Sequence, residues 1–121
     1  MSSEAERLAA LEDLVLLRVP VGSAMARLRA FPWDSDFPLV VLTRQHVQAL
    51  LGAYLEGRLD EHDCESWAAV LECRDDVGLE PGFEQLLKAF LFEVATPELA
   101  GQLTPAAAGR WSSQLNSPGR G

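Results

Sequence analysis

The chain has 121 residues, enough for one hydrophobic core and too few for a second domain. Its apolar fraction of 48%, charged fraction of 23% and mean hydropathy of +0.03 are typical of a folded globular protein and exclude a disordered or membrane-spanning chain. With 18 acidic and 10 basic residues the net charge is -8, which disfavours binding to nucleic acid or to an anionic membrane. We expect a single helical domain over residues 1–115 and a flexible tail over 116–121.

The sequence also indicates where the protein resides. The apolar runs, such as Leu14–Leu17 and Leu39–Leu42, span no more than five residues, far fewer than the roughly 20 of a membrane-spanning helix. The amino terminus is acidic, whereas a secretory signal begins with basic residues. Cys64 and Cys73 would lie about 13 Å apart along one helix, too far for a disulfide, which needs Cα atoms within about 7 Å. We therefore expect a cytoplasmic protein with two free thiols.

The first third of the chain predicts two helices and a loop. Apolar residues at helical spacing predict a first helix from Ser3 to Leu17 and a shorter one over residues 24–31. Two prolines and two aspartates make Pro32–Pro38 the main irregular loop. Leu39–Leu42 is interpreted as a buried lead-in to the next helix, because a single isolated strand would have no partner.

A helical hairpin is expected next. Thr43 opens the clearest helix, which continues to Gly57. Asp60 can cap a second helix over 61–73, whose apolar positions include Trp67. Because the linker between the two helices is only a few residues long, we expect them to be antiparallel.

The remaining segments complete an all-α fold. Arg74–Pro81 is expected to be a loop, and residues 82–95 carry the widest apolar face, typical of a central helix. Thr104 followed by Pro105 is typical of a helix N-terminus and predicts a last helix from this point. We predict a single-domain bundle of four to five helices, in which the 43–57 and 61–73 hairpin packs on the 82–95 helix.

Acidic residues are concentrated in one segment. Between Asp60 and Glu84 lie nine acidic residues and one basic residue, Arg74, so this segment accounts for the whole net charge. Such a cluster either keeps the protein soluble or forms a docking surface for a basic partner, because clustered like charge steers association. An exposed Trp33 in the loop would be a good interface anchor. The candidate partner-binding residues are Trp33, Asp60, Glu61, Glu65, Glu72, Asp75, Asp76 and Glu80.

Motifs for catalysis or metal binding are missing from the sequence. The sequence has no CxxC, HxxxH or HExxH pair for a metal and no glycine-rich loop for a phosphate. No pattern pairs a nucleophilic serine or cysteine with a general base. We therefore expect no catalytic residues, metal or cofactor. Residues Asp75 to Glu80 do not follow the pattern of a calcium-binding loop. The alternatives are a metal- or ligand-binding domain or enzyme that uses His46, His62 and nearby carboxylates, and a self-associating structural protein.

A resemblance covers residues 42–115, about 60% of the chain. The residues that carry it are Leu42-Thr43, His46, Tyr54-Leu55-Glu56-Gly57, Trp67-Ala68, Leu71-Glu72, Arg74-Asp75-Asp76, Glu80, Leu91-Phe92-Glu93, Pro97-Glu98-Leu99 and Leu103-Thr104. In these the chain resembles small uncharacterised bacterial acidic helical proteins. In size, acidity and helical content it is also similar to bacterial toxin immunity proteins, including those of the colicin D and contact-dependent inhibition type.

The resemblance implies toxin neutralisation. Together with the charge pattern it predicts a small cytosolic protein-binding module, an immunity-type inhibitor that covers a basic toxin surface with its acidic segment. The oligomeric state and the identity of the partner are left open by the sequence.

Overall fold

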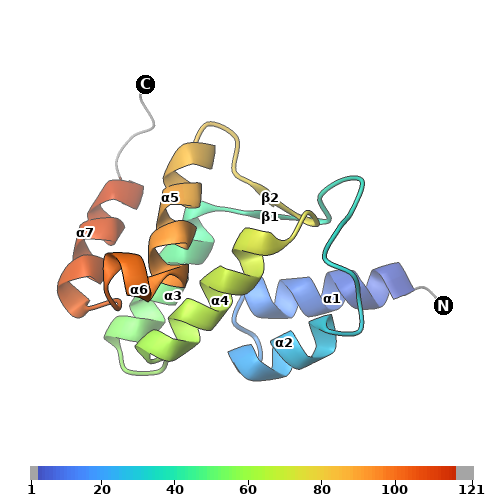
Figure 1. Cartoon of the computed structure of the whole chain (residues 1–121), viewed down its shortest axis with the longest axis horizontal. Helices are drawn as coiled ribbons and strands as arrows, with labels where there is room; N and C mark the ends of the chain where they lie inside the picture. Colours follow the sequence, from blue (N-terminus) through green and yellow to red (C-terminus); the bar gives the residue numbers. More distant parts are fainter. Residues whose placement is uncertain (1–2, 117–121) are drawn as a thin grey trace.

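The computed structural model describes residues 3–116, and this part of the chain folds into seven helices and one two-stranded sheet (Figure 1). The elements are α1 (Ser3–Val15), α2 (Val21–Leu28), β1 (Val40–Leu42), α3 (Arg44–Leu55), α4 (Glu61–Cys73), β2 (Val77–Leu79), α5 (Glu84–Ala95), α6 (Pro97–Ala100) and α7 (Pro105–Asn116). The mainly helical class is confirmed. The described helices outnumber the four to five that the sequence predicts, and the small sheet is an addition.

Local signals in the sequence set the bounds of α3 and α4. Thr43 Oγ1 accepts a hydrogen bond from the His46 N–H at 3.3 Å, and His46 Nδ1 accepts one from the Thr43 N–H at 3.0 Å, which forms a capping box. Gly57 ends α3 at a φ of 85°, a left-handed conformation that suits glycine. Asp60 and Asp63 form a second capping box at the start of α4.

The sheet corrects two predictions. Residues 39–42 are not only a lead-in, and residues 74–81 are not only a loop, because β1 and β2 pair in parallel with Val40 opposite Val77. A Cβ on Gly78 would lie 3.1 Å from the Cβ of Pro38, so glycine allows the chain before β1 to approach β2 closely. The sheet thereby positions the Pro32–Pro38 loop beside the end of α4 (Figure 1).

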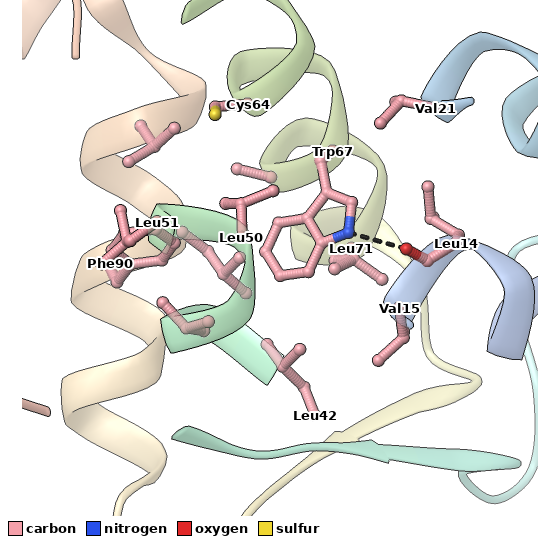
Figure 2. Close-up of a cluster of buried hydrophobic side chains, with 14 of the residues drawn as sticks. Leu14, Val15, Val21, Leu42, Leu50, Leu51, Cys64, Trp67, Leu71 and Phe90 are labelled. Atoms are coloured by element: carbon pink, nitrogen blue, oxygen red, sulfur yellow. Dashed lines mark hydrogen bonds between the residues drawn. The ribbon is translucent and has the colours of Figure 1, made fainter. Parts of the chain in front are cut away.

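Trp67 on α4 lies at the centre of the hydrophobic core (Figure 2). It is fully buried, and its Nε1–H donates a hydrogen bond to the Leu14 carbonyl of α1 at 2.9 Å. α4 packs most extensively against α5 and also contacts α2 and α3, whereas α3 packs mainly against α7. The predicted packing of 61–73 on 82–95 is therefore correct, but α4 takes a central place and the contact within the predicted hairpin is small.

The C-terminal part contains one expected and one unexpected helix. Thr104 caps α7, since its Oγ1 accepts a hydrogen bond from the Ala107 N–H at 3.1 Å. The short α6 is not predicted by the sequence. Of the expected tail, Asn116 is the last residue of α7, and residues 117–121 lie outside the described part of the chain. None of the helices within residues 3–116 has both the length and the apolar character that a bilayer crossing requires.

Candidate partner-binding site

Three of the four acidic side chains of α4 lie on one side of the helix, and the fourth, Asp63, lies on the other side. At 100° per residue, Glu61, Glu65 and Glu72 fall within a narrow arc. Glu61 and Glu72 are exposed and Glu65 is half-buried. Asp60 and Asp75 are exposed at the two ends of the helix. We call these five residues the acidic face, and within residues 3–116 none of them forms an ion pair with lysine or arginine.

Asp60 has a structural role as well. Its Oδ1 accepts a hydrogen bond from the Asp63 N–H at 2.8 Å, and this bond is the main reason why its pKa lies below the usual value. The carboxylate therefore stays charged at neutral pH and also complements the positive end of the α4 dipole.

The prediction that Asp76 contacts a partner is wrong, because its side chain is completely buried. Arg7 Nε donates a hydrogen bond to Asp76 Oδ2 at 2.8 Å, and Arg74 donates two, from Nε to Oδ1 at 2.9 Å and from Nη2 to Oδ2 at 3.0 Å. A buried carboxylate persists only when its charge is compensated in this way. Asp76 is therefore a structural residue.

Glu80 is also engaged inside the protein. Its Oε1 accepts a hydrogen bond from the Arg44 N–H at 2.9 Å and lies 3.2 Å from Arg44 Nε. These hydrogen bonds hold the pKa of Glu80 below its usual value. Glu80 thus neutralises a side chain and a backbone donor at the start of α3, and its predicted contact with a partner is not supported by this geometry.

The Asp76 cluster holds the Pro32–Pro38 loop in place. The two arginines that neutralise Asp76 also donate to loop carbonyls, Arg74 Nη2 to Pro32 at 2.9 Å and Arg7 Nη2 to Asp34 at 2.8 Å. The Asp75 N–H donates to the Trp33 carbonyl at 2.9 Å. These three hydrogen bonds from neighbouring elements hold the backbone of the loop without burying its side chains.

The side chains that this loop presents are aromatic and acidic. Trp33 is 60% exposed and Phe37 is 59% exposed, so neither contributes much to the core. A polar recess of about 520 Å³ next to Phe37 is lined by Arg7 and by the acidic side chains of Asp34, Asp36 and Asp75, together with Ser35. Trp33 is a candidate anchor from the sequence alone, whereas Asp34 and Asp36 carry no sequence signal for binding, because aspartates between prolines are common in turns.

The structure does not bring the two histidines together. His46 lies at the start of α3, whereas His62 lies at the start of α4, beyond the other end of α3. The nine residues from His46 to the end of α3 span about 13 Å. His46 is used in the α3 capping box, and burial lowers its pKa although Glu80 raises it. No group of three or more potential ligands that could hold a metal occurs in the described residues.

The two cysteines differ in their surroundings. Cys64 is buried next to the central core, and burial raises the pKa of its thiol to about 12. Cys73 is exposed at the end of α4. Both are free, so Cys64 acts as a small apolar core residue, as its place on the apolar stripe indicates.

Comparison with protein-family models, with curated proteins and with solved structures gives no match. The resemblance to immunity proteins therefore stays a prediction from the sequence.

Proposed function

We propose that the protein is a small protein-binding module, an immunity-type inhibitor that covers a basic surface of a toxin or another protein partner. The acidic face attracts the partner, and the aromatic side chains of the Pro32–Pro38 loop hold the complex. The observation that carries this proposal is the charge of the acidic face, which no arginine or lysine within residues 3–116 pairs with. In contrast, Asp76 and Glu80 of the same 60–84 segment are neutralised by the protein's own arginines.

The acidic face is longer than the distance over which salt screens its charge. α4 has 13 residues and is therefore about 20 Å long, twice the screening length of about 10 Å at 0.1 M salt. A row of uncompensated carboxylates over this length raises the association rate with a cationic surface at low salt. It also destabilises the folded protein slightly by repulsion, a cost that a binding role would explain.

The Pro32–Pro38 loop supplies the short-range part of binding. Interface hot spots are enriched in tryptophan, and anchors bind best when they are held in the bound conformation beforehand. Trp33 meets the first condition with an exposed indole, and the hydrogen bond from the Asp75 N–H to its carbonyl holds the backbone that carries this side chain. The free thiols of Cys64 and Cys73 support a cytosolic location as part of the same proposal.

The partner is first identified in a host lysate by crosslinking to the tagged protein. It is then purified on its own for rate measurements. We expect its association rate to fall by at least about tenfold between low and high salt, while the dissociation rate changes little. We expect Trp33→Ala to raise the dissociation rate instead, by at least about tenfold. An association rate that does not depend on salt would refute the role of the acidic face. A dissociation rate that Trp33→Ala leaves unchanged would refute the role of Trp33 as an anchor.

Two substitutions are unsuitable for this test. Reversal of Asp76 or Glu80 would break contacts with Arg7, Arg74 or Arg44, so a loss of binding would reflect damage to the fold.

A further inference from the structure

The polar recess beside the Pro32–Pro38 loop combines carboxylates with an exposed aromatic side chain. Its volume is about 520 Å³, and it is lined by Arg7, Asp34, Ser35, Asp36, Phe37 and Asp75. Figure 1 shows the loop between α2 and β1 next to the turn that joins α4 to β2. The recess is therefore built from three segments that lie far apart in the sequence.

The charge of this lining is negative. Three of the lining residues carry a carboxylate and one carries a guanidinium. That guanidinium, from Arg7, already donates hydrogen bonds to Asp76 and to the Asp34 carbonyl. Asp34, Asp36 and Asp75 are all exposed, and none of them forms an ion pair within residues 3–116. The charge of the lining therefore favours a cationic occupant.

The turn of the loop is closed by Ser35. Its hydroxyl donates a hydrogen bond to the Phe37 carbonyl at 2.6 Å and accepts one from the Phe37 N–H at 3.4 Å. The carboxylates of Asp34 and Asp36, on either side of Ser35, are not used for this turn. Their mutual repulsion costs stability, and a bound cation would offset this cost.

The arrangement suits a planar organic cation better than a metal ion. Although three carboxylates line the recess, the described residues contain no group of three potential ligands that could hold a metal. A guanidinium carries five N–H donors in one plane, so it reaches carboxylates that do not converge on a point. Its face also stacks on aromatic rings, and Phe37 offers a ring that is 59% exposed.

We propose that this recess binds an arginine side chain of the partner. The guanidinium lies over the Phe37 ring and donates hydrogen bonds to the carboxylates of the lining, while Trp33 of the same loop contacts the surface around it. This inference rests on the proposed function and adds the residue that the partner has to present to the loop.

The test uses three labelled glycine-serine peptides and measures fluorescence anisotropy with the full chain at low salt. The peptides carry three arginines, three lysines or three citrullines. We expect the arginine peptide to bind at least about fivefold more tightly than the lysine peptide, because an ammonium has no planar fork and stacks less well. We expect the citrulline peptide, which keeps the shape but lacks the charge, to bind at least about tenfold more weakly than the arginine peptide.

Variants of the protein locate the site. We expect Phe37→Ala to weaken binding of the arginine peptide by about fivefold and to remove the preference over lysine. Phe92→Ala, at a phenylalanine that is 50% exposed on α5, should leave both unchanged. Asp36→Asn should weaken binding by at least about threefold, and Glu61→Gln, at the opposite end of α4 from Asp75, should weaken it much less.

The outcomes separate this proposal from the proposed function. Equal binding of the arginine and lysine peptides, or equal effects of Phe37→Ala and Phe92→Ala, would overturn the arginine site and leave the acidic face in place. Failure of both cationic peptides to bind would count against the acidic face as well. Displacement of the arginine peptide by calcium at constant ionic strength would overturn the proposal in favour of an inorganic cation. Concentration-dependent dimerisation that Phe37→Ala abolishes would overturn it in favour of a second copy of the chain.

Discussion

Replacing Asp76 with asparagine tests whether the buried cluster holds the fold and the Pro32–Pro38 loop. The substitution keeps the shape of the side chain but removes the charge that Arg7 and Arg74 neutralise. Asparagine can accept hydrogen bonds through one atom only, so at least one guanidinium donor would face an amide donor.

The expected cost follows from burial. Asp76 is fully buried, and the side chains of Arg74 and Arg7 are 7% and 15% exposed. Removing one partner of a buried ion pair costs about 3–5 kcal/mol, and the lower end applies because Arg7 retains some contact with water. A loss of about 3 kcal/mol is a large share of the 5–15 kcal/mol of a typical domain and would lower Tm by about 12 °C in a protein of this size.

The assay is urea unfolding at neutral pH, with Asp75→Asn as the matched control. Asp75 is exposed and has no ion pair within residues 3–116, so its replacement is expected to change stability by less than about 0.5 kcal/mol. Chymotrypsin should cleave after Trp33 faster in Asp76→Asn than in the control, because the loop loses its connections. If the two variants are equally stable and equally resistant, the structural role assigned to Asp76 is wrong.

Other predictions concern titration, thiol reactivity and exposure. The lowered pKa of His46 means that the unfolded chain takes up its proton first. The contribution of neutral His46 to the stability of the fold is therefore complete above the unfolded-state pKa near 6.5. This contribution is lost as the pH falls from there through the lower folded-state pKa. The variant His46→Gln keeps a capping-box acceptor but cannot titrate, so its thermal unfolding should lack this part of the pH dependence. A thiol reagent should label Cys73 and spare Cys64 until the protein unfolds, and labelling of both in native protein would contradict the burial of Cys64. Trp33→Ala should change stability by no more than about 0.5 kcal/mol, whereas Trp67→Ala should cost about 3–5 kcal/mol; similar values in urea unfolding would contradict their different burial.

The helices could be predicted from the sequence because their signals are local. Thr43, Asp60 and Thr104 each act as the predicted cap, and Gly57 ends α3 as expected. The sheet could not be predicted in this way. Each strand has three residues, and the partners lie 37 positions apart, so neither segment carries a strand signal of its own.

The candidate site was predictable in part for the same reason. Helical spacing places Glu61, Glu65 and Glu72 together from sequence alone. Asp76 carries the same charge, but its burial depends on Arg7, which lies 69 residues away, and no local pattern reports such a contact. The aromatic loop is recognisable from its prolines, whereas its attachment through Asp76 is visible only in the folded protein.

The most direct test of the acidic face is the association rate of the purified partner with two triple variants of equal net charge. We expect neutralisation of the α4 glutamates to slow association at low salt by at least about tenfold, and this difference to vanish at high salt. Neutralisation of exposed glutamates elsewhere should slow it much less. The variants are Glu61→Gln/Glu65→Gln/Glu72→Gln and Glu4→Gln/Glu6→Gln/Glu98→Gln. Equal rates for the two variants would show that total charge, and not the face on α4, governs binding.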